Sequence, residues 1–218
     1  MIPRIIHKIF LNDDAERLPQ AIERGGLHSW RGHGYEVVLW DRTTSEAFLR
    51  EEFDQQHIAL LRSLRPLAFQ CDFLRVCILL RRGGVYSDLK QKLLVPLDSI
   101  ILPTHHIVLT MDRVVAGLSR RPIQNCFLAC TPNHPYLQAY YEHIVHNVRS
   151  QFYGKAPISI TGPAAFATAL ETVPAESGDR VLRLYFTGPN RDHYIKFADT
   201  RDAMPLIMHK FDHSSGAD

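Results

Sequence analysis

Residues 66–88 read PLAFQCDFLRVCILLRRGGVYSD, which predicts a helix, a glycine turn and a short strand. Pro66 suits the first turn of a helix, where a missing N–H is no loss. Gly83 and Gly84 end that helix, and we expect one of them to adopt the left-handed cap conformation. A short strand over residues 85–89 follows and carries Asp88 near its end. The apolar side chains of the helix share one face because they are spaced by four, three and four residues: Leu67, Cys71, Leu74 and Ile78.

Outward from this unit, β-branched apolar runs alternate with segments of helical spacing. Such alternation is typical of an α/β domain built around a mostly parallel central sheet that is flanked by helices. The 218 residues contain no internal repeat and no linker, so we expect one domain over residues 1–218. The predicted strands cover residues 4–10, 34–40, 107–110, 125–129, 181–186 and 206–208, and the predicted helices cover 44–64, 135–148 and 162–170.

Composition and charge exclude several classes of protein. The net charge is +2 and no basic stripe stands out, which argues against a nucleic-acid partner. The four cysteines form no Cys-x-x-Cys pair, so we expect buried thiols in a reducing compartment. No apolar run approaches the roughly 20 residues that span a bilayer, and the start lacks the core of a signal peptide. The sequence predicts a cytoplasmic protein, with peripheral contact at the inner face of the membrane if its acceptor is membrane-bound.

Four charged residues gather around the glycine turn. Asp72 and Arg75 are three apart on the helix and share a face, while Asp88 and Lys90 are two apart in an extended segment and point to one side. Ligands of open α/β sheets bind at the carboxyl ends of strands, where Asp88 would lie. Carboxylates beside cations suit a diphosphate, with or without a divalent metal. Taken singly, each pair also fits a solvated helix face, a helix cap or a protected edge strand.

The order of these motifs resembles the sugar-binding Asp-x-Asp region of glycosyltransferase family 32. The resemblance covers about three quarters of the chain. It rests first on Ala68-x-x-x-Asp72-x-x-Arg75, then on Gly83-Gly84-Val85-Tyr86-Ser87-Asp88 and Pro96-Leu97-Asp98. Weaker landmarks lie outside this centre: Ile2-Pro3-Arg4-Ile5-Ile6-His7-Lys8-Ile9-Phe10, Gly34-Tyr35-Glu36-x-x-Leu39-Trp40-Asp41, Asn125-x-Phe127-x-Ala129 with His134-Pro135, and Thr161-Gly162-Pro163.

The resemblance implies a GT-A-type, Rossmann-like domain that binds a UDP- or GDP-linked sugar, usually with Mn²⁺ or Mg²⁺. It further implies a hexosyltransferase that retains anomeric configuration and acts on a glycan or lipid-linked glycan, as in polysaccharide biosynthesis. Carried over by position, Ile5 and His7 would line the base pocket, Asp72 would bind the sugar or ribose, and Arg75 would contact the sugar or phosphates. Asp88 would hold the metal. The remaining predicted binding residues are Gly84, Tyr86, Asn125, Thr161 and Gly162, and His209 is the candidate second metal ligand.

Lys90 departs from the family pattern, because an ammonium stands where the second metal-site acid is expected. Either the metal has fewer protein ligands, or Lys90 partly replaces it and acts on the leaving diphosphate together with Asp88. A pseudoenzyme that binds the donor without turnover is a further reading. A metal-dependent phosphohydrolase would need a second acid near Asp88. A nucleotidyltransferase would show a glycine-rich basic loop after the first strand, where Leu11-Asn12-Asp13-Asp14 stands instead.

Overall fold

The computed structural model describes residues 1–11, 22–112, 122–154, 156–175, 180–187, 194–197 and 203–208. The strands are β1 (Ile5–Ile9), β2 (Glu36–Trp40), β3 (Gly84–Ser87), β4 (Lys92–Leu93), β5 (Ile107–Met111), β6 (Ile123–Cys130), β7 (Val181–Thr187), β8 (Tyr194–Lys196) and β9 (Pro205–Met208). The α-helices are α1 (Arg42–Glu52), α2 (Gln55–Ser63), α3 (Leu67–Arg82), α4 (Pro135–Arg149) and α5 (Pro163–Leu170). Shorter helical turns cover Ile22–Leu27, His28–Trp30, Leu97–Ser99 and Pro157–Ser159.

Every predicted strand and helix is present, with shifted ends. The segment 44–64 forms two helices because Asp54 starts a new one: its carboxylate accepts a hydrogen bond from the His57 N–H. No sequence pattern predicted β4 and β8, because both strands are too short for an alternating pattern to emerge. No helix in the described residues is both long and apolar enough to cross a membrane.

The central sheet is mixed, so the expectation of a mostly parallel sheet was wrong. Its strand order is β2-β1-β3-β6-β5-β7-β8-β9-β4. The pairs β1–β2, β1–β3 and β5–β7 are parallel. The other five pairs are antiparallel. The reason is topological: β6 enters between β3 and β5 in the opposite direction, and the chain after β7 returns in short antiparallel strands.

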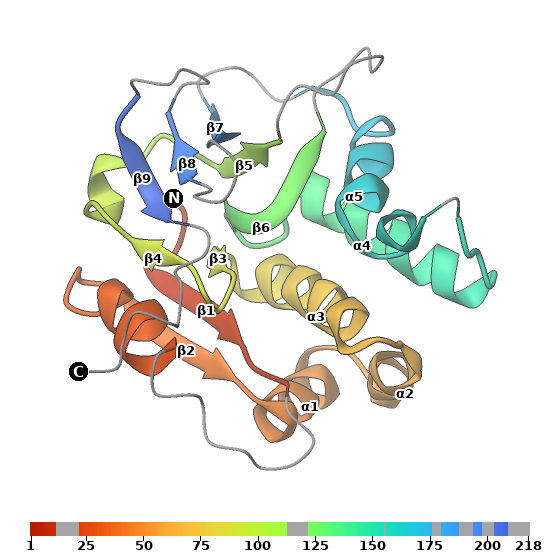
Figure 1. The fold of residues 1–218 in the computed structure, drawn as a ribbon. Helices are drawn as coiled ribbons and strands as arrows, with labels where there is room; N and C mark the ends of the chain where they lie inside the picture. Colours follow the sequence, from red (N-terminus) through yellow and green to blue (C-terminus); the bar gives the residue numbers. More distant parts are fainter. Residues whose placement is uncertain are drawn as a thin grey trace.

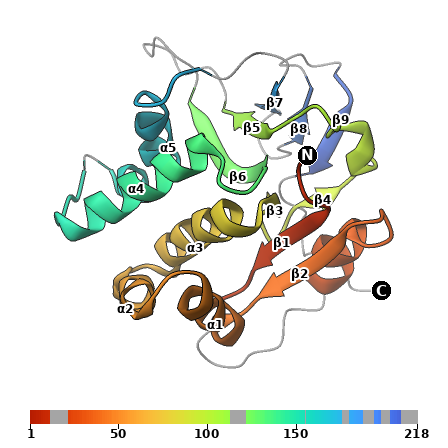
Figure 2. The ribbon, with the colours of Figure 1, turned by 180° about the vertical axis from the view of Figure 1, so that it is seen from behind.

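Two apolar layers stabilise the sheet. The five α-helices lie along one face, as Figure 1 and Figure 2 show from opposite sides, and their buried side chains form one cluster with that face. On the other face, residues of β1, β3 and β6 pack against residues of β4, β7, β8 and β9 and against Trp30. The sheet therefore curls, and its last strands close over the face that the helices leave open.

The glycine turn between α3 and β3 has the geometry that the sequence predicts. Both glycines have positive φ, at 62° for Gly83 and 90° for Gly84. A Cβ on Gly84 would lie 2.6 Å from the carbonyl oxygen of Ile5, and a Cβ on Gly83 would lie 2.8 Å from that of Cys130. Glycine is therefore required here both for its backbone conformation and for the close approach of β1 and β6. After this turn, β3 enters the sheet between β1 and β6.

We expect Gly84→Ala to destabilise the protein more than Gly32→Ala, which serves as its matched control. Gly32 also has positive φ, at 81°, but its Cβ would meet nothing within 4 Å. The backbone strain of about 1–2 kcal/mol is therefore common to both variants, whereas the clash adds about 1–3 kcal/mol only at Gly84. Urea unfolding measures the difference. Equal losses of unfolding free energy would show that the turn does not need the close approach.

Candidate functional site

A pocket of about 400 Å³ opens at the carboxyl ends of β1 and β3. It brings together six of the predicted site residues: Asp72, Arg75, Tyr86, Asp88, Lys90 and Asn125. Ile9, Ala68, Cys71 and Leu89 complete its lining. A larger and mostly apolar pocket of about 960 Å³ lies between α5 and the ends of β5 and β6, and no predicted site residue lines it.

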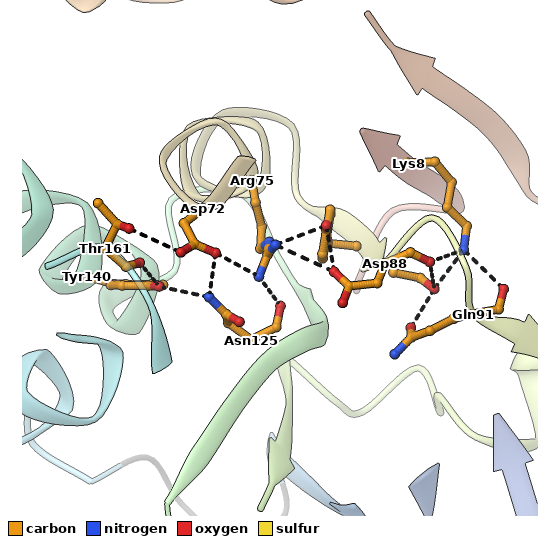
Figure 3. A network of polar contacts seen from close by, with 10 residues as sticks. Lys8, Asp72, Arg75, Asp88, Gln91, Asn125, Tyr140 and Thr161 are labelled. Atoms are coloured by element: carbon orange, nitrogen blue, oxygen red, sulfur yellow. Dashed lines mark hydrogen bonds and ion pairs between the residues drawn. The ribbon is translucent and has the colours of Figure 1, made fainter. Parts of the chain in front are cut away.

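Arg75 joins the two carboxylates of the site (Figure 3). Its guanidinium lies 3.3 Å from Asp72 Oδ1 and 3.5 Å from Asp88 Oδ1. It also donates hydrogen bonds to the Asn125 carbonyl at 2.5 Å and to the Tyr86 hydroxyl at 3.0 Å. The Arg75 side chain is only 6% exposed, so its charge depends on these partners rather than on water.

Tyr86 lies between Arg75 and Asp88 and forms a hydrogen bond with each of them. Its ring lies beneath the Arg75 guanidinium, 4.1 Å from Cζ to the ring centroid. Its hydroxyl donates to Asp88 Oδ1 at 2.9 Å. Burial raises the pKa of Tyr86 well above its ordinary value, so the phenol keeps the proton that it donates. Asp88 Oδ1 is thereby fixed from two sides.

Asp72 is held by two side chains besides Arg75. Asn125 of β6 donates to Oδ1 at 2.9 Å, and the Thr161 hydroxyl donates to Oδ2 at 3.1 Å. Tyr140 of α4 donates to the Thr161 carbonyl at 2.5 Å and lies 3.2 Å from the Gly162 carbonyl. The segment before α5 is thus tied to the site through Asp72. Thr161 and Gly162 lie behind this carboxylate and do not line the pocket.

Asp88 and Lys90 lie in a turn, so the expected extended segment was wrong at this point. β3 ends at Ser87, and the Gln91 N–H donates to the Asp88 carbonyl at 2.9 Å. The Asp88 N–H donates to the Cys126 carbonyl of β6 at 2.9 Å. Both side chains still reach the same pocket. Lys90 is exposed, and among the described residues its ammonium makes no hydrogen bond or ion pair.

Ile5, His7 and Gly84 lie outside the pocket lining. His7 is buried: its Nε2–H donates to the Gly83 carbonyl at 2.9 Å, and its Nδ1 accepts from Trp40 Nε1 at 3.1 Å. These two bonds require the neutral ring. Burial, foremost, lowers the pKa of His7 to about 4. His7 therefore anchors the glycine turn, and the base-pocket role of Ile5 and His7 stays a prediction.

Within the described ranges, no group of three or more His, Cys, Asp or Glu side chains could share a metal ion. His209 lies outside the described residues.

Sequence reasoning missed Tyr140 and Lys8. Tyr140 donates a hydrogen bond to the Thr161 carbonyl, and Lys8 donates one to the Asp88 carbonyl. A signal existed for Lys8, since a lysine inside an apolar strand is exceptional, whereas Tyr140 looks like any helix residue that faces a core.

Asp72 predicts a specific dependence of stability on pH. Burial raises its pKa to about 6, although Arg75, Thr161 and Asn125 oppose this shift. The folded state therefore binds more protons than the unfolded state between about pH 4 and pH 6, and the contribution of Asp72 to stability falls as pH rises through this window. We expect the unfolding free energy of wild type, minus that of Asp72→Asn, to decrease by about 2–3 kcal/mol across it. Urea unfolding at several pH values measures this, and a difference that does not change with pH would contradict the assignment.

Comparisons with known proteins agree on the identity of the central region. A family model described as the glycosyltransferase sugar-binding region containing DXD motif matches residues 23–107. An uncharacterized glycosyltransferase of Acanthamoeba polyphaga mimivirus is 29% identical over 90 residues, which are 41% of this chain and 36% of that protein. The matched part thus spans about a third of the length of this relative.

Two solved structures share the fold. The PaToxG glycosyltransferase superposes with a TM-score of 0.56 at 17% identity, over 78% of this chain and 69% of that chain. The ligand-free glycosyltransferase domain from the YGT toxin superposes with a TM-score of 0.50 at 11% identity, over 78% and 77%. The mixed α/β fold is therefore like that of GT-A glycosyltransferases. Because the matched region contains α3, the glycine turn and Asp88, residues 23–107 of this chain are similar to the glycosyltransferase sugar-binding region containing the DXD motif.

Proposed function

We propose that this protein is a glycosyltransferase that moves a sugar from a nucleoside diphosphate sugar to a hydroxyl group of a glycan or other acceptor. One observation carries the proposal: within the family-matched region, Arg75 links two carboxylates at the wall of a pocket that also presents the exposed ammonium of Lys90. Carboxylates can bind sugar hydroxyls, and a free cation at hydrogen-bonding reach suits a phosphate. A UDP- or GDP-linked hexose is the donor we propose.

The proposed roles of the four charged residues follow from how exposed each side chain is. Asp72 and Arg75 are nearly buried and set the shape and charge of the pocket, while Asp88 and Lys90 are accessible to a ligand. In the proposed reaction, the bond from the anomeric carbon to the diphosphate breaks as the acceptor oxygen bonds to that carbon from the same side. The acceptor proton leaves with the diphosphate. Configuration is then retained, and Lys90 stabilises the charge that develops on the leaving group.

A divalent cation fits this donor set only in part. Both oxygens of Asp72 and one oxygen of Asp88 already accept hydrogen bonds, so within the part of the chain that the structure describes Asp88 Oδ2 is the available carboxylate oxygen of this pair. Mg²⁺ in proteins is often held by one or two carboxylates together with substrate phosphates and water. Asp88 would hold such an ion, which would supply further positive charge to the diphosphate. His209 as its second ligand stays a prediction.

A binding protein without turnover is the second candidate function. Lys90 favours it, because the position of the second motif acid carries an ammonium. A metal-dependent phosphohydrolase is less well supported, since the described residues contain no group of three or more His, Cys, Asp or Glu side chains that could hold a metal ion. Incubation with UDP- and GDP-sugars separates these functions. Acceptor mass gain with release of the nucleoside diphosphate indicates transfer, and saturable binding with neither indicates a pseudoenzyme.

The acceptor is proposed from its chemistry alone. A glycan or a lipid-linked glycan offers the hydroxyl group that the reaction needs. A lipid-linked acceptor would bring the protein to the inner face of the membrane through substrate binding alone. Polysaccharide biosynthesis in the cytoplasm is the setting we propose for it.

We expect Asp88→Asn to lower turnover by about 100-fold or more, because the variant loses the charge that orders the donor diphosphate and its cation. The matched control is Asp98→Asn. Asp98 also follows β3 within the matched region, but its exposed carboxylate pairs with Arg4 at 2.8 Å on the surface. Release of the nucleoside diphosphate is the measurement. Wild-type turnover in Asp88→Asn would rule out this pocket as the site of transfer.

Lys90→Asp tests whether the Lys90 ammonium or a metal ion neutralises the negative charge of the diphosphate. With EDTA present, we expect its affinity for UDP or GDP to fall about tenfold or more relative to wild type, since a charge-assisted contact becomes a repulsion. Mn²⁺ should restore binding in this variant more than in wild type, because two carboxylates then face the metal.

Lys92→Asp is the control for Lys90→Asp, since it makes the same charge change on an exposed side chain of β4 that does not line the pocket. Titration calorimetry measures the affinity of wild type, Lys90→Asp and Lys92→Asp for UDP or GDP. Equal affinities of Lys90→Asp and Lys92→Asp, with and without Mn²⁺, would exclude a role for Lys90 at the diphosphate.

A further inference from the structure

Lys8 is a fully buried lysine near the carboxyl end of β1, on the side of Asp88 away from Arg75 (Figure 3). Its ammonium donates to Ser87 Oγ at 2.8 Å and to the Asp88 carbonyl at 3.0 Å, and it lies 3.5 Å from the Gln91 carbonyl. The Trp30 ring lies against it, 4.3 Å from Nζ to the centroid. All of its oxygen partners belong to residues 87–91.

This arrangement is unusual for a buried cation. Among the described residues, no carboxylate oxygen lies within ion-pair distance of the Lys8 ammonium. Buried lysines without an acidic partner are rare, because desolvation of the charge is unfavourable. Burial accordingly lowers the pKa of Lys8 well below its ordinary value, and the nearby charge of Asp88 partly opposes this. Three neutral oxygens that match the three donors of an ammonium take the place of a counter-ion.

The segment that Lys8 holds is the point where the chain leaves the centre of the sheet. β3 is third in the strand order and β4 is last, yet only residues 88–91 separate them. This short crossover contains both accessible polar residues of the pocket, Asp88 and Lys90. It is fastened at the Asp88 N–H by the Cys126 carbonyl, and at the Gln91 carbonyl by Trp30 Nε1 at 2.8 Å. Lys8 supplies the bond to the Asp88 carbonyl from β1.

From this geometry we infer that Lys8 is a positioning residue, which fixes the 88–91 turn from behind and so aims Asp88 and Lys90 into the pocket. Asp88 is held between two cations: its carboxylate faces Arg75 and its main-chain carbonyl faces Lys8. The inference rests on the proposed function, because it assigns the consequence of this positioning to the binding of a nucleoside diphosphate.

The test compares Lys8→Met with wild type in two measurements. In hydrogen exchange, we expect the Asp88 and Gln91 amides to exchange about tenfold faster or more in the variant, relative to amides of α3 that report global unfolding. In calorimetry with UDP or GDP, at a temperature where both proteins are fully folded, we expect the dissociation constant to rise about tenfold or more.

Two further variants make the test specific. Ser87→Ala removes one acceptor of the ammonium with little change in volume, and it should shift both readouts in the same direction by a smaller factor, even if Lys8→Met does not fold. Thr110→Val is the matched control. It removes a fully buried hydrogen bond at 2.8 Å to the Phe127 carbonyl, away from the turn, and should lower global stability without changing either readout.

The outcomes separate this inference from the proposed function. Unchanged exchange of the turn in Lys8→Met and Ser87→Ala overturns the positioning role. Faster exchange with an unchanged dissociation constant overturns its link to the ligand. Wild-type protein that binds neither UDP nor GDP overturns the proposed function, and with it the assigned consequence, whereas the exchange result still decides whether Lys8 holds the turn.

Discussion

The guanidinium of Arg75 is a charge buried where α3, the end of β3 and the start of β6 meet. A buried cation is stable only when carboxylates and hydrogen-bond acceptors surround it, and removal of one partner of a buried ion pair generally destabilises a protein by about 3–5 kcal/mol. Arg75 therefore constrains Asp72, Asp88 and the Asn125 carbonyl to one place. The three elements cannot shift independently, and the pocket follows from this constraint.

The same constraint explains why the accessible part of the site is small. Asp72 and Arg75 pair with each other and form the wall, so among the described residues a ligand would mainly meet Asp88 Oδ2 and the exposed ammonium of Lys90. Lys8 acts from the opposite side of the same turn. Charges of alternating sign thus line up from β1 through the turn to α3. Such a preorganised row can stabilise a diphosphate without rearrangement of the protein.

The sequence predicted the parts of the fold that local patterns determine. The spacing of apolar residues defined α3, and Gly83-Gly84 defined its end, because positive φ is a property of glycine itself. The mixed sheet was not predictable, since the direction of β6 depends on long-range pairing that leaves no mark on its own residues. A lysine inside an apolar strand marks Lys8 as exceptional, but its partners were not predictable because they lie about 80 positions later in the chain.

The most direct test of the central claim is a crystal structure with UDP or GDP bound in the presence of Mn²⁺. We predict diphosphate oxygens within hydrogen-bonding distance of the Lys90 ammonium, beside Asp88 Oδ2, with Arg75 still paired to both carboxylates. A diphosphate bound elsewhere, or a bound state in which Asp88 has turned away from Arg75, would contradict it.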